Sequence, residues 1–366
     1  MTRSFPTLYS RTKGKAVQQW DISAIREDNR AFIEVRHGQL DGQFQLSRKE
    51  IFGKSIGRSN ETTPFYQAIL EAESKWKKQK TLKYSESIPD EDQVILLPML
   101  AHKYLDHKKK VGFPCYVQPK FNGARVLPHK ISPVDVEYIT RGNKKWTTLG
   151  HITPYITRMV EQGIILDGEI YNHDMHFQEI ISAIKKLNQN TRRLKLFVYD
   201  IAIPNKTFAE RLQILQSFPW PKDGPIELAP TFKAYNGIEI KEYYDHFVSQ
   251  GYEGLIIRNA HGFYEFNHRS HNLLKYKDFQ EEEFVIVGGK AGRGTHEGCC
   301  VFECKPNVTH GTTFWVVPKG SLEYQRELLR NLPKYIGKLL TVSFLEYSMD
   351  GTPMGNTVGK AIRDYE

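Results

Sequence analysis

The most informative segment of the chain reads Gln118-Pro119-Lys120-Phe121-Asn122-Gly123-Ala124-Arg125. An apolar, strand-like run at 114–117 leads into it. Its Asn-Gly pair predicts a tight turn with positive backbone angles, which lets a chain approach a ligand closely. Two interpretations follow: a surface hairpin with an incidental lysine, or a lysine nucleophile held beside a turn. A nucleophilic lysine must lose its proton near neutral pH, so it needs cationic neighbours or partial burial.

The composition is that of a basic globular protein with room for two or three domains. Its 366 residues are 40% hydrophobic and 25% charged, and the formal net charge is +9. This charge favours a polyanionic partner such as nucleic acid, although a solvated basic surface is the alternative. The sequence has neither an apolar run long enough to cross a membrane nor the apolar stretch of a signal peptide, so we expect a cytoplasmic protein.

The cysteines predict buried, reduced thiols. There are four of them, at Cys115, Cys299, Cys300 and Cys304. The last three lack the paired two-residue gaps of a zinc site, and their segment alternates in the manner of a strand. Without a disulfide framework, the expected compartment is a reducing one.

Three regions differ in composition. Residues 1–84 begin with short strand-like runs and end in an amphipathic helical pattern at 63–80. A polar, charged linker is predicted at 85–95. Residues 96–279 mix strand and helix patterns, whereas residues 280–366 are strand-rich with many glycines, which is typical of a small barrel. The predicted fold class is therefore α+β and multidomain.

Five further segments combine charged or aromatic residues with strand-like residues. They are Thr140-Arg141-Gly142-Asn143, Leu166-Asp167-Gly168-Glu169-Ile170, Leu196-Phe197-Val198-Tyr199-Asp200-Ile201, Tyr252-Glu253-Gly254-Leu255-Ile256-Ile257-Arg258 and Leu273-Leu274-Lys275-Tyr276-Lys277. Asp-Gly-Glu is expected at a turn, and the two lysines of Lys-Tyr-Lys on one strand face. Each segment alone has an ordinary explanation as a turn, a strand start or a solvated face. Their joint occurrence in a basic protein favours a nucleotide site.

In this order, the segments resemble those of the covalent nucleotidyltransferases, namely polynucleotide ligases and messenger-RNA capping enzymes. In that family a lysine becomes linked to a nucleoside monophosphate. The family's lysine motif is usually Lys-x-Asp-Gly-x-Arg, and here Asn122 takes the place of the aspartate. The resemblance covers essentially the whole chain. It implies a nucleotidyltransferase domain (ATP-grasp-like α+β) at 96–279, followed by an OB-fold β-barrel at 280–366.

The resemblance implies an ATP-dependent DNA ligase of the phage type. Such an enzyme seals nicks in double-stranded DNA through a lysyl-AMP intermediate and an adenylated 5′-phosphate. It is expected to use ATP with Mg²⁺ or Mn²⁺ and to act as a monomer. The alternatives are an RNA ligase, a capping-type guanylyltransferase and a catalytically inactive DNA-binding homologue.

Roles at the phosphates follow from the same resemblance. Lys120 would be the nucleophile. Lys275 and Lys277 would neutralise the α-phosphate and, as nearby cations, lower the pKa of Lys120. Glu169 and Glu253 would hold the divalent metal ion.

Other residues would bind the nucleoside and the nucleic acid. Tyr199 would stack on the base, and Gln118 would read the adenine amino group. Arg125 and Arg141 would contact the ribose or a phosphate at the nick.

The end of the chain resembles the basic motif that closes the ligase barrel. It reads Gly359-Lys360-Ala361-Ile362-Arg363-Asp364-Tyr365-Glu366. Lys360 and Arg363 would orient the departing pyrophosphate. The alternatives are surface charge for Lys360 and a salt bridge to Asp364 for Arg363.

The first region resembles a WGR-type DNA-binding module through residues 32–42. Here Arg36-His37-Gly38-Gln39 keeps only the glycine of the Trp-Gly-Arg motif. Residues 56–64 resemble an insertion beside such modules in some phage-type ligases. A basic helix end with Lys75, Lys77, Lys78 and Lys80 would suit phosphate contacts, or it could be a solvated helix terminus.

Overall fold

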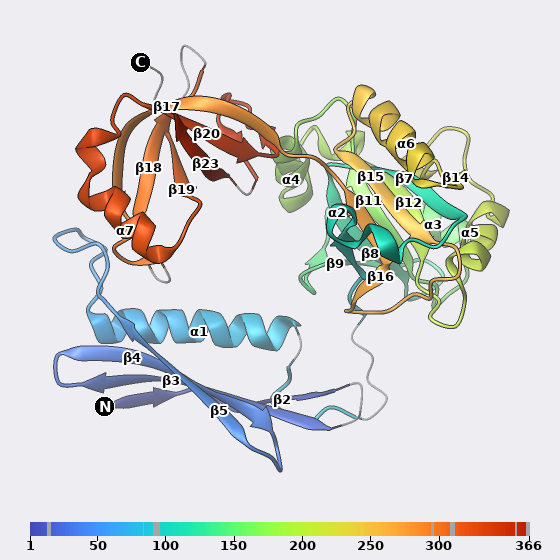
Figure 1. Ribbon diagram of the computed structural model, residues 1–366. Coiled ribbons are helices and arrows are strands. Elements are labelled where there is room, and N and C mark those ends of the chain that lie inside the picture. The colour runs from blue at the N-terminus through green and yellow to red at the C-terminus, as the bar shows by residue number, and fades with distance from the viewer. Residues whose placement is uncertain are drawn as a thin grey trace. The chain divides into compact units, whose positions relative to one another are not determined.

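The computed structural model describes residues 1–12, 16–82, 84–90, 96–293, 296–307, 312–355 and 357–363. The chain forms two compact units, Met1–Lys275 and Tyr276–Glu366 (Figure 1). Helices and strands are mixed in both, which confirms the predicted α+β, multidomain class. None of the helices in the described part of the chain is both long enough and apolar enough to span a membrane.

A twisted antiparallel sheet and one long helix form the first part of the chain. The strands are β1 (Thr2–Ser4), β2 (Leu8–Arg11), β3 (Val17–Glu27), β4 (Arg30–Gln39) and β5 (Phe44–Ile51), in the order β1-β3-β4-β5 with β2 also paired to β3. Helix α1 (Pro64–Leu82) lies across one face of the sheet (Figure 1). Ala68 and Ala72 of α1 are fully buried with Ile22 and Ala24 of β3, because small side chains let the helix approach the sheet closely.

The predicted helix at 63–80 is confirmed to within two residues. The Thr63 hydroxyl accepts a hydrogen bond from the Tyr66 N–H at 3.3 Å, and Pro64 occupies the first helical position, where its missing N–H costs nothing. Ser85 pairs with Tyr9, so the start of the predicted linker lies against β2. Residues 91–95 of that linker lie outside the described residues. The resemblance to a WGR module stays a prediction.

Two sheets form the middle of the chain. The first, in the order β10-β9-β8-β11-β12-β13, consists of β8 (Ala124–Lys130), β9 (Val136–Thr140), β10 (Lys145–Trp146), β11 (Leu166–Tyr171), β12 (Lys195–Ile201) and β13 (Ile226–Leu228). The second, in the order β14-β7-β15-β16-β6, consists of β6 (Leu100–Lys103), β7 (Cys115–Lys120), β14 (Phe232–Ala234), β15 (Gly254–Asn259) and β16 (Arg269–Tyr276). The helices are α2 (Tyr104–His107), α3 (Thr153–Met159), α4 (Phe177–Lys185), α5 (Phe208–Ser217) and α6 (Gly237–Ser249), with 3₁₀ turns at Lys108–Lys110 and Thr191–Arg193.

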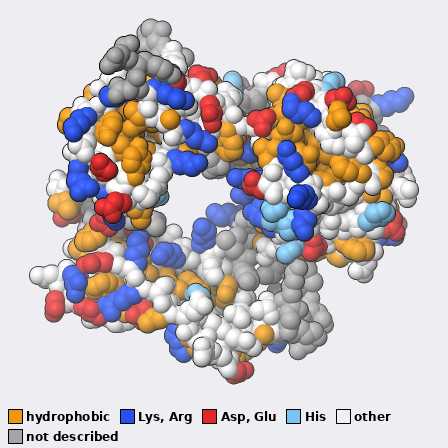
Figure 2. Space-filling model, viewed as in Figure 1, with side chains coloured by type: hydrophobic (Ala, Val, Ile, Leu, Met, Phe, Trp, Pro, Cys, Tyr) orange, Lys and Arg blue, Asp and Glu red, His pale blue; other side chains and the backbone are white. Residues whose placement is uncertain are grey.

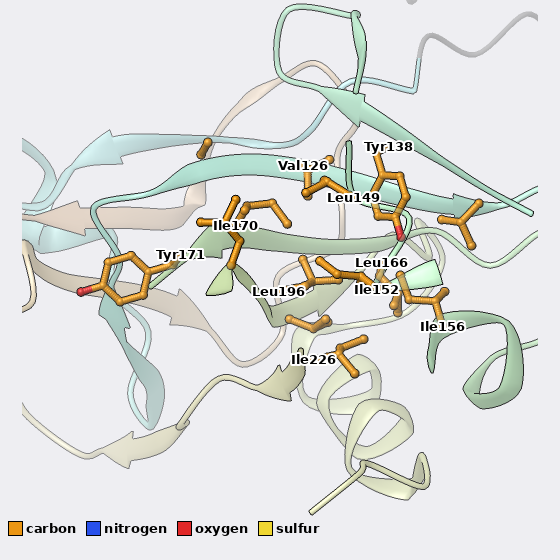
Figure 3. Packing of buried hydrophobic residues seen from close by; sticks show 14 of the residues in the cluster. Val126, Tyr138, Leu149, Ile152, Ile156, Leu166, Ile170, Tyr171, Leu196 and Ile226 are labelled. Atoms are coloured by element: carbon orange, nitrogen blue, oxygen red, sulfur yellow. The ribbon is translucent and has the colours of Figure 1, made fainter. Parts of the chain in front are cut away.

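The first central sheet has a closely packed apolar core on one face. Val126, Ile170 and Leu196, from three adjacent strands, are fully buried. They belong to one cluster with Ile152 and Ile156, and in Figure 3 Leu196 lies next to Ile152. Burying each such side chain contributes roughly 1.5–3 kcal/mol before the entropy of ordering is counted. This face is therefore rigid, and the strands present functional side chains elsewhere.

The turn after Lys120 is not a β-hairpin, which excludes the interpretation of this segment as a surface hairpin with an incidental lysine. β7 pairs with β14 and β15, whereas β8 pairs with β9 and β11, so residues 121–123 carry the chain from one sheet to the other. Positive φ angles occur elsewhere in the chain, not at Asn122 or Gly123. Gly123 is required for a different reason: a Cβ there would overlap the carbonyl oxygen of Ile170 and lie 2.9 Å from Cγ of Glu169.

The second unit is built around a closed barrel, as predicted. Its strands, in barrel order, are β17 (Gln280–Ala291), β18 (Cys300–Lys305), β19 (Phe314–Pro318), β23 (Val358–Arg363) and β20 (Leu339–Phe344). Helix α7 (Leu322–Arg330), a 3₁₀ turn (Leu332–Lys334) and the short pair β21 (Glu346–Tyr347) and β22 (Pro353–Met354) complete the unit. Cys300 and Cys304 point inward from β18 as free thiols, which confirms the prediction of buried, reduced cysteines.

Candidate active site

Lys120 ends β7 and lies against Glu253. Backbone pairing fixes this arrangement, because β15 runs antiparallel to β7 and the Glu253 N–H donates to the Lys120 carbonyl at 3.0 Å. The Lys120 ammonium forms an ion pair with the Glu253 carboxylate, and each side chain is 19% exposed. The lysine is thus partly buried, held at its tip by one acid, and still open to a ligand.

Glu169 is the second acid beside Lys120. It lies within β11 and not at a turn, so the predicted turn at Asp-Gly-Glu was wrong; the irregularity there is a bulge between Asp167 and Gly168. The Tyr199 hydroxyl donates to the Glu169 carboxylate at 3.2 Å. Burial raises the pKa of Glu169 to about 7, and the nearby charges of Lys120 and Arg125 only partly oppose this shift. A partly buried carboxylate with a raised pKa next to a lysine is an unusual pair that indicates chemistry.

A cavity opens above these groups and collects most of the predicted site. It is lined by Gln118, Lys120, Arg125, Arg141, Glu169, Tyr199 and Lys275, together with Leu100, Ala101, Pro119, Phe121, Ile256, Arg258, Arg269 and Leu273. Apolar and aromatic walls suit a base, while the cations and carboxylates suit phosphates with a metal ion. The cavity therefore has the chemical character of a nucleotide site.

Arg125 holds the cavity wall together through hydrogen bonds, in addition to contributing positive charge. Its guanidinium donates twice to Asp167, at 2.9 and 2.6 Å, and once to the Met99 carbonyl at 2.6 Å. Asp167 is fully buried and also accepts from the Tyr264 hydroxyl at 2.7 Å. Burial lowers the pKa of Arg125, but the Asp167 carboxylate more than offsets this and leaves it well above its usual value. Arg125 thus joins β8 to β11, which the sequence pattern did not suggest.

A buried ionic network supports the opposite wall. Asp200 of β12 is fully buried between two arginines, with Arg211 at 2.7 Å and Arg258 at 2.6 Å. Arg258 also donates to the side-chain amide oxygen (Oε1) of Gln118 at 2.8 Å. The Gln118 amide nitrogen donates to the Tyr199 carbonyl and to Thr231, both at 3.0 Å. Both N–H groups of the Gln118 side-chain amide are therefore used within the protein, and the amide oxygen Oε1 retains one acceptor position.

Sequence reasoning missed Arg211, Arg258, Arg269 and Asp167 as parts of the site. Arg258 stood inside a quoted segment, yet nothing in its neighbours showed that it would point into the core. A signal existed for Asp167 and Asp200, since each is an acid within an apolar run and a buried acid needs a cationic partner. The partners themselves lie between 11 and 58 positions away along the chain.

Of the two lysines predicted on one strand face, Lys275 lies within β16 and Lys277 lies one position beyond its end. β16 ends at Tyr276, and Lys277 follows it as the chain enters the second unit. Lys275 lines the cavity.

In the barrel, Lys360 lies 3.6 Å from Glu281, and Arg363 lies 3.4 Å from Glu283 while donating to Thr341 at 3.0 Å. The described partner of Arg363 is therefore Glu283, whereas Asp364, Tyr365 and Glu366 lie outside the described residues.

Comparison with known proteins agrees with this geometry. The family model for an ATP dependent DNA ligase domain matches residues 98–277. The chain is 25% identical to the DNA ligase of African swine fever virus (isolate Warthog/Namibia/Wart80/1980), over 94% of this chain and 91% of that ligase. It is 26% identical to DNA ligase 4 of Homo sapiens, over 53% of this chain and 26% of that protein.

Solved structures share the fold. The structure named Pmar-Lig_PreS3 has a TM-score of 0.65 and 21% identity, and the match covers 81% of this chain and 71% of that one. A structure from work on Lig E DNA ligases has a TM-score of 0.58 and 20% identity, and the match covers 74% of this chain and 100% of that one.

Proposed function

The chain belongs to the ATP-dependent DNA ligase family, and from this premise we propose that it seals nicks in double-stranded DNA through a Lys120–AMP intermediate. The observation that carries the proposal is the ion pair of Lys120 with Glu253, whose lysine lines a cavity that Glu169 and Lys275 also line.

The first step is attack by the Lys120 amine on the α-phosphorus of ATP. An N–P bond forms, the bond from the α-phosphorus to the bridging oxygen breaks, and pyrophosphate leaves with that electron pair. The amine must lose a proton, and the Glu253 carboxylate in contact with it can accept one. Lys275 would offset the negative charge that develops on the α-phosphate. Lys277, Lys360 and Arg363 are proposed to act on the same phosphates.

The base and ribose would occupy the apolar side of the cavity. Tyr199 would stack on adenine. The side-chain amide oxygen of Gln118 would accept a hydrogen bond from the adenine amino group with its remaining acceptor position. Arg141, which is exposed in the turn after β9, would contact the ribose or a DNA phosphate. Arg125 would act mainly by holding β11, and with it Glu169, in place.

The donor set also fits a divalent cation. Glu169 and Glu253 are carboxylates, the ligand type that Mg²⁺ and Mn²⁺ prefer, and Glu169 is a partly buried acid whose charge is incompletely compensated. When bound there, the metal would offset phosphate charge. In the later steps, the AMP group would pass from Lys120 to a 5′-phosphate, and the adjacent 3′-hydroxyl would displace AMP to join the strands.

We place this activity in the cytoplasm and in a monomer. The four free, buried cysteines suit a reducing compartment.

The decisive experiment follows covalent labelling and sealing in one sample. The protein would be incubated with α-labelled ATP and Mg²⁺, and singly nicked DNA would be added afterwards. We expect a labelled protein that loses its label as the nick is sealed. Lys120→Ala should abolish labelling, whereas the matched control Lys222→Ala, at an exposed loop lysine, should label normally.

Three results would overturn the proposal. Label that persists in Lys120→Ala would show a different nucleophile. Labelling by GTP in place of ATP would indicate a capping-type guanylyltransferase. Sealing of nicked RNA but not of nicked DNA would indicate an RNA ligase.

A further inference from the structure

Three histidines gather at one end of the second central sheet, outside the residues that line the cavity. His102 belongs to β6, His107 ends α2, and His271 lies on β16. The rings of His102 and His271 are stacked, with centroids 4.2 Å apart and planes 10° from parallel. The ring of His107 meets them edge-on, at 4.5 and 4.8 Å. Figure 2 shows histidine side chains gathered beside Lys and Arg over this part of the chain.

Backbone pairing explains why residues far apart in the sequence meet here. β6 runs parallel to β16, and the register shifts between Ser270 and Leu274 opposite the step from Ala101 to His102. The extra residues of β16 bulge at this point, and His271 is among them. The chain then turns directly into α2, which brings His107 back over the same place.

The donor atoms are close enough to hold one ion. One ring nitrogen from each of the three histidines lies within 4.8 Å of the others. A tetrahedral zinc ion with Zn–N bonds of about 2.0–2.1 Å holds two nitrogens about 3.4 Å apart. Side-chain rotation of His271, which is exposed, can supply the remaining contraction.

The cluster is anchored in the fold, because His102 and His107 are partly buried and only His271 is exposed. The His102 ring is also hydrogen-bonded to the backbone of Arg269. Such a bond fixes which nitrogen carries the proton and leaves the other one available, as is usual for metal-binding histidines.

We propose that His102, His107 and His271 form a binding site for one borderline transition-metal ion, of which Zn²⁺ is the representative. Three imidazoles with no carboxylate among them select Zn²⁺, Co²⁺, Ni²⁺ or Cu²⁺ over Mg²⁺. The site is separate from the Glu169–Glu253 pair and does not depend on the proposed ligase activity. It leaves a fourth position for water.

The ion would cross-link the wall of the cavity. Leu100 and Ala101, directly before His102, line the cavity, and so does Arg269, which donates to the Ala101 carbonyl. A metal at the histidine cluster joins β6 and α2 to β16 immediately beside these residues. Binding to the folded state alone then stabilises the protein by mass action.

The test titrates metal into the full-length protein after removal of all metals with a chelator. Excess Mg²⁺ is kept in every sample to occupy oxygen-ligand sites. Co²⁺ is the spectroscopic probe, since tetrahedral nitrogen ligation gives visible absorption, and Zn²⁺ is the probe for thermal stability. We expect one equivalent of either metal to bind and Zn²⁺ to raise the Tm by at least about 3 °C.

Variants then locate the site. His107→Asn and His271→Asn should each weaken Co²⁺ binding at least about tenfold and remove the Zn²⁺-dependent rise in Tm. The matched control His261→Asn, at an exposed loop histidine, should behave as wild type. Wild-type affinity in the His107→Asn/His271→Asn double variant, or no binding by the wild-type protein, would overturn the proposal.

A measurement on the wild-type protein covers the case in which a variant fails to fold. Diethyl pyrocarbonate modifies exposed imidazoles, and mass spectrometry identifies the modified histidines. Zn²⁺ should protect His271 and leave His261 unprotected. Equal modification of His271 with and without Zn²⁺ would exclude the site.

Discussion

At the scale of single residues, Gly123 shows how the lack of a side chain allows a close approach to Glu169, a proposed metal ligand. The Asn-Gly pair predicted a turn with positive φ, yet the glycine is needed because β8 and β11 approach too closely for a Cβ. The contact atoms include Cγ of Glu169, so any residue larger than glycine must move a proposed metal ligand.

We therefore expect Gly123→Ala to impair both folding and activity. The added methyl group would overlap the Ile170 carbonyl, and relieving that clash should cost about 1–3 kcal/mol of stability. Displacement of Glu169 should lower the rate of lysine adenylation at least about tenfold. The matched control is Gly150→Ala, because a Cβ at that exposed turn meets nothing within 4 Å. Equal stability and labelling rates in the two variants, by urea denaturation and α-labelled ATP, would show that the close approach does not matter.

Glu169 yields a prediction about pH. Burial raises its pKa from 4.5 to about 7 in the folded protein, so the folded state holds a proton that the unfolded state releases. Its contribution to stability is fully present below pH 4.5 and is lost as the pH rises to 7. Glu169→Gln copies the protonated form. It should be only slightly more stable than wild type at pH 5 and more stable by about 1–3 kcal/mol at pH 8.

The measurement is urea denaturation from pH 5 to pH 8 with EDTA present, so that metal binding cannot contribute. The control Glu242→Gln, on the exposed side of α6, should show no gain that grows with pH. Parallel stability curves for Glu169→Gln and wild type would mean that burial does not penalise the Glu169 charge. The same substitution should abolish activity, which makes Glu169 a group that costs stability in order to serve the reaction.

At the scale of elements, the sequence predicted which segments form strands better than it predicted which strands pair. The strands around 116–120, 196–201 and 254–258 lie where the apolar patterns indicated. The local rule for a hairpin, Asn-Gly between two apolar runs, would pair β7 with β8, while the true partners are β14 and β15, more than a hundred residues away. Local patterns report burial and periodicity, but pairing between distant strands depends on the packing of the whole core.

The same limit applies to the candidate site. Lys120, Glu169, Glu253 and Lys275 could be named because their motifs keep a fixed order in a known family. The network of Asp200, Arg211 and Arg258 could not, because each pair depends on a fold that brings separate elements together. From composition alone these arginines would be expected on the solvated surface, whereas Arg211 is 1% exposed.

This network should be essential for folding. Asp200→Asn would leave two buried guanidinium groups without their shared carboxylate, so we expect a loss of about 3–5 kcal/mol, measured by urea denaturation. The matched control is Asp245→Asn, which breaks the exposed ion pair with Lys241 on α6 and should cost less than about 1 kcal/mol. A similar cost for both substitutions would show that the buried network contributes no more than a surface pair.

At the scale of the whole molecule, the proposed chemistry draws on two compact units. The nucleophile, both acids and Lys275 belong to Met1–Lys275, whereas Lys360 and Arg363 belong to Tyr276–Glu366. Within their own unit, these two cations already face Glu281 and Glu283. These ion pairs are about half exposed and therefore weak, so exchanging a carboxylate for pyrophosphate is energetically feasible.

If Lys360 and Arg363 act only on the departing pyrophosphate, removing them should slow adenylation of the lysine but not the later joining of the strands. Lys360→Ala/Arg363→Ala should slow formation of the lysyl-AMP adduct at least about tenfold, because two cations that would stabilise departing pyrophosphate are gone. It should leave the joining of a nick that already carries 5′-linked AMP close to the wild-type rate, since no pyrophosphate leaves in that step. The matched control Lys319→Ala removes an exposed barrel lysine outside the motif and should leave both rates unchanged. Single-turnover measurements with labelled ATP and with pre-adenylated nicked DNA separate the two steps. If the double variant slows both steps equally, the cations bind DNA or stabilise the barrel, and a separate role in adenylation is excluded.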